Sequence, residues 1–322
     1  MIKTTRVLLM IVMVLGLLGG CAVAGSQPTV TANVVALKGP TGIGMVQMIA
    51  EPGDQWVFTL AGSPDEIVAA IASGSADIAA APTNLAATLY NRLNGGVEII
   101  ALNTLGVLHI LERGDTIQSV GDLEGKTLYA TGQGATPEYA IQYILKQAGV
   151  NTAIEFKGEH AELATLAAAD ELDLVMLPEP FATSLQVQNP SWRRALDVTE
   201  LFKTAAASSD HPDAVLSMGC VIVRKEFIEQ HPDVVDAFLD AHKASVEFVQ
   251  VNPEEAAELT EATGIMPSAA VVLKALPGTN ITFVSGAEMR DQIEPFFQML
   301  FDANPAAVGG SMPGDDFYYR AQ

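Results

Sequence analysis

The chain has 322 residues, of which 49% are hydrophobic and 17% charged, and its 38 acidic residues outnumber its 17 basic residues, so the formal net charge is −21. A surface this acidic repels nucleic acid and anionic lipid headgroups, which excludes nucleic acid as a partner. Five scattered histidines and two cysteines form neither a zinc-binding pattern nor a disulfide framework, so we expect no metal and no cofactor.

The N-terminus has the pattern of a secretion signal. Two basic residues precede an apolar run of 12 residues, whereas a membrane-spanning helix needs roughly 20. Residues 18–21 (LGGC) resemble the bacterial lipobox, whose cysteine is acylated and becomes the new N-terminus. We therefore expect a cleaved signal peptide over residues 1–20, a lipid on Cys21 and a linker over residues 21–29, which leaves a mature formal charge of −23. An ordinary cleaved signal and an uncleaved anchor are the alternatives.

The segments that follow alternate between strand-like and helix-like patterns. Residues 63–66 (SPDE) mark a helix start, with serine as the N-cap, proline at the first helical position and glutamate completing a capping box. The strands are β-branched or apolar on both faces, which is typical of a covered, largely parallel sheet. We predict strands at residues 30–37, 56–60, 76–81, 97–102 and 126–130, and helices at residues 43–49, 67–73, 138–147, 232–250 and 285–301.

The chain also contains an internal duplication. Residues 76–89 align with residues 172–185 without a gap, at an offset of 96, with an aspartate and a proline at matching positions. The strand, loop and helix of residues 126–147 repeat those of residues 34–50 at nearly the same offset. A mature chain of about 300 residues is larger than a usual single domain, so we expect two lobes built on one plan.

Four motifs, in order, carry a resemblance to a known family. Residues 117–128 (IQSVGDLEGKTL) resemble the start of the second lobe in ABC-transporter solute-binding proteins of the nitrate, sulfonate, taurine and thiamine-precursor type. The same family is resembled by residues 74–79 (GSADIA), residues 178–180 (PEP) and residues 223–235 (VRKEFIEQHPDVV). The resemblance covers most of residues 30–255.

The resemblance implies an α/β protein with the type II periplasmic-binding-protein fold, in which two α/β lobes joined by a two-strand hinge close over a ligand. Lobe 1 is expected to comprise residues 30–110 and 220–322, and lobe 2 residues 111–219. The chain is expected to cross between the lobes near residues 107–112 and to return near residues 216–223.

Ligands of open α/β sheets lie beyond the carboxyl ends of the strands, where loops and helix N-termini converge. Two glycine-containing loops at such ends, residues 38–44 and 131–137, each lead into a helix whose free backbone N–H groups suit a carboxylate or sulfonate oxygen. The alternative is that they serve only as turns. We expect Thr136 to be an N-cap, and Tyr139 either to stack on the ligand or to pack in the core. The residues expected to bind the ligand are Lys38, Pro40, Thr41, Gly42, Thr83, Asn84, Thr104, Gln133, Gly134, Ala135, Thr136 and Glu179.

Glu179 is the most specific single candidate, because two prolines hold its carboxylate at a predicted strand end. It either accepts a hydrogen bond from an amine or ring N–H of the ligand, or it caps a neighbouring helix or pairs with Arg193 or Arg194. Lys38 is the only nearby base, and Glu179 opposes anions. We therefore expect a zwitterionic, neutral or nitrogen-heterocyclic ligand in preference to a bare oxoanion.

The expected function is that of a lipid-anchored, monomeric receptor on the extracytoplasmic side of the cell membrane, in the periplasm or at the cell surface. It is expected to capture a small organic nutrient between the lobes and to deliver it to an ABC permease and its ATPase. The sequence offers no convincing nucleophile, metal cluster or acid–base pair, so we expect no enzyme activity, and Cys220 is interpreted as an apolar strand residue. The alternatives are a ligand-binding module of a membrane sensor, and an enzyme of pyrimidine or menaquinone precursor synthesis on the same fold.

Overall fold

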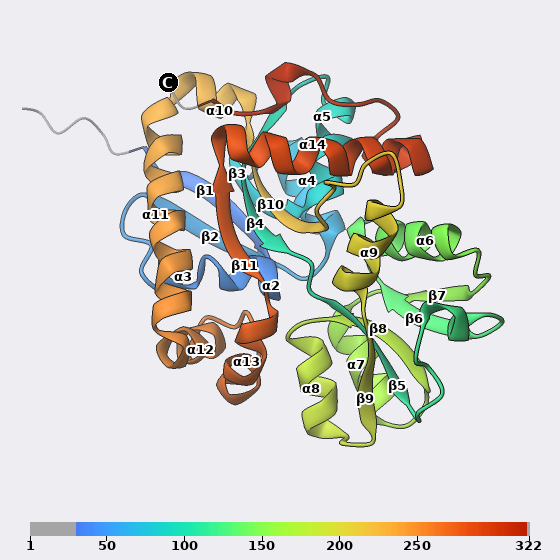
Figure 1. Ribbon diagram of the computed structural model, residues 1–322. Coiled ribbons are helices and arrows are strands. Elements are labelled where there is room, and N and C mark those ends of the chain that lie inside the picture. The colour runs from blue at the N-terminus through green and yellow to red at the C-terminus, as the bar shows by residue number, and fades with distance from the viewer. Residues whose placement is uncertain (1–29, 321–322) are drawn as a thin grey trace, which may run out of the picture. The chain divides into compact units, whose positions relative to one another are not determined.

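The computed structural model describes residues 30–320, in which two β-sheets are accompanied by helices (Figure 1). This mixed α/β architecture with two sheets is the fold class that the sequence predicts. The predicted signal peptide (residues 1–20), Cys21 and the linker (residues 21–29) lie outside the described residues. Among the helices of residues 30–320, none is both long enough and apolar enough to cross a membrane.

The first sheet, sheet A, has six strands in the order β11-β4-β10-β3-β1-β2. Strands β1, β2 and β3 run parallel to one another, whereas β10 is antiparallel to β3 and β4, and β11 is antiparallel to β4. Every residue of β3 is buried, as expected of a strand with covered faces. The strands are Ala32–Leu37 (β1), Trp56–Ala61 (β2), Ile78–Pro82 (β3), Val97–Leu105 (β4), Ser217–Arg224 (β10) and Ile281–Ser285 (β11).

The second sheet, sheet B, has five strands in the order β7-β6-β8-β5-β9. Strand β6 runs parallel to β7 and β8, and β5 is antiparallel to β8 and β9. Strand β8 is fully buried, like β3 in sheet A. The strands are Leu108–Arg113 (β5), Thr127–Thr131 (β6), Ala153–Lys157 (β7), Leu174–Pro178 (β8) and Trp192–Asp197 (β9).

The two sheets share one plan, which matches the duplication in the sequence. The order β2-β1-β3-β10 in sheet A corresponds to β7-β6-β8-β5 in sheet B, with three parallel strands followed by an antiparallel one. Strand β3 begins at Ile78 and β8 at Leu174, so these equivalent strands are separated by the predicted 96 residues. Helices α4 and α7 keep the same offset, because they begin at Pro64 and His160.

Helices connect the strands and pack against the sheets (Figure 1). Those before residue 208 are α2 (Pro40–Ile43), α3 (Val46–Ala50), α4 (Pro64–Ser73), α5 (Thr83–Arg92), α6 (Thr136–Ala148), α7 (His160–Ala168), α8 (Phe181–Gln188) and α9 (Val198–Ala207). The later ones are α10 (Lys225–Gln230), α11 (Pro232–Val251), α12 (Pro253–Ala262), α13 (Ala269–Ala275) and α14 (Gly286–Ala303). Short 3₁₀ turns are η1 (Val120–Leu123), η2 (Leu276–Gly278), η3 (Pro305–Val308) and η4 (Asp315–Phe317).

The helix predicted over residues 43–49 is divided into α2 and α3 at Gly44 and Met45. A Cβ atom added at Gly44 would lie 3.2 Å from Cγ2 of Ile281 and 3.8 Å from Nε2 of His242. The backbone therefore passes close to β11 and α11 at this point, and glycine permits that approach. The resulting bend leaves the short helix α2 at the end of β1.

The chain passes between the sheets twice. Strand β4 ends at Leu105 and β5 begins at Leu108, so two residues make the first passage. The return runs from β9 through α9 and residues 208–216 to β10. Gly106, in the first passage, packs against the start of α9, where an added Cβ atom would lie 2.6 Å from Cγ2 of Thr199. The residue limits given above for the two lobes stay a prediction.

A continuous hydrophobic core reaches from sheet A to sheet B. The ring of Tyr143 in α6 lies 5.9 Å from that of Phe202 in α9, which in turn lies 5.9 Å from the ring of Phe296 in α14. Figure 1 shows α6 and α9 beside each other, next to α14. Apolar packing of this kind joins the two lobes along one side of the boundary between them.

Candidate ligand-binding cleft

A cavity of about 320 Å³ opens where parallel strands of both sheets end. Strands β1, β2 and β3 of sheet A and β6, β7 and β8 of sheet B each contribute residues at or just beyond their carboxyl ends. Val107, between the sheets, and Met218, in β10, complete the lining. The carboxyl ends of such strands are where ligands of open α/β sheets bind, because loops and helix N-termini converge there.

Five of the twelve residues predicted to bind a ligand line this cavity. They come from the two loops singled out in the sequence, one after β1 and its equivalent after β6. That both loops reach one cavity follows from the shared plan of the two sheets. Whether they touch a ligand stays a prediction. The five residues are Lys38, Pro40, Thr41, Gln133 and Ala135.

Three other predicted residues, all in the sheet A lobe, lie behind the lining. Gly42 is inside α2, where an added Cβ atom would be 2.8 Å from the carbonyl oxygen of Leu37. The hydroxyl of Thr83 lies 2.9 Å from that of Ser217, and the hydroxyl of Thr104 donates to Oδ1 of Asn103 at 3.1 Å. The polar groups of both threonines are therefore engaged within the protein.

Asn84, Gly134 and Thr136 contact one another across the lobe boundary. The side-chain amide of Asn84 donates to the carbonyl oxygen of Gly134 at 3.1 Å, and the hydroxyl of Thr136 donates to Oδ1 of Asn84 at 3.2 Å. Asn84 and Thr136 are no more than 1% exposed. The expectation that Thr136 is the N-cap of α6 is wrong, because Ala135 takes that position and the Thr136 hydroxyl is directed to Asn84 instead.

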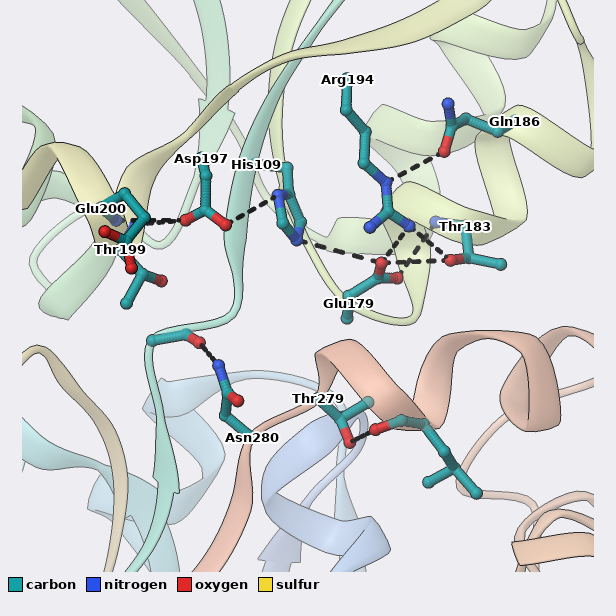
Figure 2. A network of polar contacts seen from close by, with 12 residues as sticks. His109, Glu179, Thr183, Gln186, Arg194, Asp197, Thr199, Glu200, Thr279 and Asn280 are labelled. Carbon is teal, nitrogen blue, oxygen red and sulfur yellow. Dashed lines mark hydrogen bonds and ion pairs between the residues drawn. The ribbon is translucent and has the colours of Figure 1, made fainter.

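Glu179 is fully buried and lies outside the cavity lining. Figure 2 shows its carboxylate turned toward Arg194, with which it forms an ion pair, and toward Thr183. The backbone N–H of Thr183 donates to Oε2 of Glu179 at 3.1 Å, and the Thr183 hydroxyl donates to Oε1 at 3.1 Å. These are the helix-capping and arginine-pairing contacts of the second interpretation above. Nε2 of His109 lies 4.0 Å from the same carboxylate. The pKa of His109 is lowered, mainly by burial and to a smaller extent by the positive charge of Arg194.

Four charged side chains line the cavity and, among the residues that the structure describes, form no ion pair: Lys38, Asp65, Lys157 and Glu159. The ammonium group of Lys157 lies 5.6 Å from the centre of the Tyr129 ring. Two positive and two negative groups thus remain free to meet opposite charges on a ligand.

His160 and Phe156 add aromatic surface to the same lining. Nδ1 of His160 is 2.5 Å from the hydroxyl oxygen of Thr131, and the imidazole lies 5.1 Å from the ring of Phe181. Burial lowers the pKa of His160 to about 4, so its ring is neutral near pH 7. A neutral imidazole held through one nitrogen offers the other as either a donor or an acceptor, according to the tautomer.

The cavity residues at positions 156–160 were missed by the sequence interpretation, because the strand that ends there was not predicted. Strand β7 (AIEFK) is short and leaves Ala153 and Glu155 exposed, so it lacks the apolar pattern of the buried strands. The duplication carried a usable signal, since residues 157–160 are equivalent at the offset of 96 to residues 61–64, which end β2 and begin α4.

The arrangement is built for binding, with hydrogen-bonding groups, charges of both signs and aromatic surface around one cavity. Within residues 30–320 no group of three or more His, Cys, Asp or Glu side chains is placed to hold a metal ion. Cys220 is fully buried in β10, outside the lining, and burial raises its thiol pKa far above the ordinary value. Its thiol is therefore unreactive, as expected of an apolar strand residue.

The same fold occurs in solved structures of transport proteins. An ABC transporter protein from Parabacteroides distasonis is 23% identical, and the alignment covers 91% of this chain and 99% of that protein, with a TM-score of 0.75. The periplasmic aliphatic sulphonate binding protein SsuA from Escherichia coli is 17% identical, with 92% and 94% covered and a TM-score of 0.69. The alkanesulfonate-binding protein SsuA from Xanthomonas axonopodis pv. citri, bound to MOPS, is 14% identical, with 90% and 96% covered and a TM-score of 0.68.

Compared by sequence, the chain matches a family model. No curated protein sequence matches this chain. A family model described as NMT1/THI5 like matches residues 59–256, which is more than half of the chain and includes strands of both sheets. The chain therefore belongs to the NMT1/THI5 like family.

Proposed function

We propose that this protein is the substrate-binding protein of an ABC importer and captures a small organic nutrient between its two lobes. One observation carries the proposal: the cavity is lined by the ends of six strands from two separate sheets. A ligand in it contacts both lobes at once, so it binds the closed arrangement better than an open one and shifts the population toward closure. The similar solved structures, an ABC transporter protein and two sulfonate-binding proteins, support this function.

The ligand proposed here is a small zwitterionic, neutral or nitrogen-heterocyclic molecule. A volume of about 320 Å³ is at the lower end of the range for small-molecule sites, which runs from roughly 300 to 1,000 Å³. Lys38 and Lys157 suit an acidic group, and Asp65 and Glu159 suit a basic one. Glu179 is not needed for this selectivity, because Arg194 already neutralises it.

We further propose that the protein acts as a monomer tethered through a lipid on Cys21, outside the cytoplasm, and delivers its ligand to the permease and ATPase of the importer without altering it. The lipobox-like residues 18–21 (LGGC) support the tether. Cys21→Ser is expected to remove the lipid while residues 31–320 still fold. Mass spectrometry of the intact protein from a bacterial membrane fraction tests this, and an unchanged acyl mass on the variant would overturn the tether.

The proposed function is tested by thermal unfolding of the full-length protein with a panel of amino acids, aminosulfonates, bare oxoanions and pyrimidines. A true ligand at 100 times its Kd adds about 2.7 kcal/mol to the free energy of unfolding, and for a chain of this size that raises the Tm by roughly 4 °C. Lys157→Gln is expected to weaken the shift. Lys243→Gln, an exposed position on α11 outside the lining, is the matched control. A ligand whose shift is the same in both variants would exclude Lys157 from the site.

A further inference from the structure

Asn84, the second residue of α5, joins three separate parts of the chain. Its side-chain amide donates to the carbonyl oxygen of Gly134 in the sheet B lobe and to that of Ala307 in η3 of the sheet A lobe, at 3.1 and 3.2 Å. Its backbone N–H donates to the Thr136 hydroxyl at 3.4 Å, and that hydroxyl donates to Oδ1 of Asn84 at 3.2 Å. The side chain is therefore held within its own lobe by one partner and to the opposite lobe by two.

We propose that Asn84 is a clasp that holds the two lobes closed and positions the cavity loop of residues 131–135. This inference rests on the proposed function, because a clasp has a role only in a protein that opens and closes over a ligand. The bond to Ala307 keeps the asparagine in place, and the bonds to Gly134 and Thr136 are those that break when the lobes separate. The loop that they hold carries Gln133 and Ala135 into the cavity.

The duplication gives this contact a counterpart. At the offset of 96, the turn of Thr83 and Asn84 is equivalent to the turn of Glu179 and Pro180. That second turn also meets the opposite lobe, because a Cβ atom added at Gly278 would lie 3.5 Å from Cγ of Glu179. Figure 2 places Glu179 across from the segment that carries Thr279 and Asn280.

The two equivalent turns therefore each contact the opposite lobe: the turn between β3 and α5 contacts the sheet B lobe, and the turn between β8 and α8 contacts the sheet A lobe. The Asn84 contact consists of hydrogen bonds, and water replaces these bonds when the lobes open. The Glu179 contact is one of van der Waals packing, because the Glu179 carboxylate already pairs with Arg194 and accepts hydrogen bonds from Thr183 inside one lobe. Asn84 is thus the contact whose loss changes the balance between open and closed molecules.

Hydrogen exchange of the full-length protein without ligand tests the clasp. We expect Asn84→Ala to raise the ratio of open to closed molecules by roughly tenfold, the factor that corresponds to the net contribution of one or two neutral hydrogen bonds. Exchange should accelerate at residues 131–136 and also at the far contact, in residues 179–183 and 276–280. Asn91→Ala is the matched control, because Asn91 lies on the same helix and its amide donates to the carbonyl oxygens of Val308 and Ser311 within one lobe.

Faster exchange confined to residues 131–136 and 304–309 would overturn the clasp, since it would show a local contact without effect on closure. Thr136→Val, which removes only the cross-lobe hydroxyl, gives the same readout if Asn84→Ala fails to fold. A protein that binds a solute, yet whose far contact does not respond to either variant, refutes the clasp alone. A wild-type chain that binds no solute refutes the proposed function independently of these exchange rates.

Discussion

His242 lies in α11 with no exposed surface, and neither ring nitrogen has a hydrogen-bond partner among residues 30–320. Its ring is 6.0 Å from that of Phe238 and 5.4 Å from that of Phe283. Burial in this apolar surrounding lowers the pKa of His242 from 6.5 to about 3. Below pH 6.5 the unfolded chain therefore takes up a proton at this position, whereas the folded protein does not until the pH approaches 3.

The stability that depends on neutral His242 is thus complete above pH 6.5 and is lost as the pH falls from 6.5 toward 3. Each pKa unit corresponds to 1.36 kcal/mol, so the full loss amounts to about 5 kcal/mol, of which about 2 kcal/mol falls between pH 7 and pH 5. The variant His242→Leu has no proton to bind. It should be as stable as the wild type at pH 7 or more so, because an unpartnered polar ring is replaced by an apolar side chain.

Urea unfolding of both proteins at pH 7 and pH 5 measures this difference. The free energy of unfolding of the wild type should fall by about 2 kcal/mol more than that of His242→Leu over this interval. His160, whose pKa is also lowered, to about 4, remains in both proteins, so its contribution cancels in the comparison. An equal pH dependence in the two proteins would mean that His242 is hydrated or paired in the folded state and is not buried as a neutral, unpartnered ring.

Three further predictions, made with variants at two positions, test other parts of the structure. Glu179→Ala leaves the Arg194 guanidinium and the α8 N-terminus without their carboxylate. We expect urea unfolding to show a free energy of unfolding lower by about 2 kcal/mol, which is less than for a fully buried pair because Arg194 is 36% exposed. A decrease below about 0.5 kcal/mol would contradict the buried pair. The same variant should keep most of its ligand-induced thermal shift, and disappearance of that shift in a folded protein would return Glu179 to the site. Gly106→Ala places a methyl group against Thr199 in the first passage between the sheets, so thermal unfolding should show a lower Tm. The double variant Gly106→Ala with Thr199→Gly should restore the Tm, because it removes the side chain that the methyl group meets. Gly121→Ala, at an exposed glycine, is the control.

Much of the framework could be predicted from the sequence, because it depends on local patterns. The apolar run of β3 and its copy 96 residues later predicted equivalent buried strands in two sheets. The residues 63–66 (SPDE) predicted the start of α4, although Glu66 accepts a hydrogen bond from the N–H of Gly62 in place of that of Ser63. The glycine-containing loops predicted two walls of the cavity, since the carboxyl ends of parallel strands meet at one edge.

The rest depends on contacts between distant segments, which no local pattern records. The position of Asn84 at a strand end was predictable, but its partners Gly134, Thr136 and Ala307 are brought together only by the packing of the two lobes. Glu179 was a candidate for a ligand contact by its position at a strand end, but in the fold β9 places Arg194 beside it and the two side chains form an ion pair. Polar side chains at a cavity edge choose between a ligand and a protein partner according to such tertiary neighbours.

We propose that the two lobes close over a small solute and release it unaltered. Native mass spectrometry of the full-length protein, extracted in mild detergent from bacterial membranes that contain it, shows whether such a solute is bound. We expect a non-covalent small molecule that is lost on unfolding and is recovered with an unchanged mass after prolonged incubation with the protein. A protein that carries no such molecule from any growth medium, or that converts the bound molecule into a product, is not a receptor of this kind.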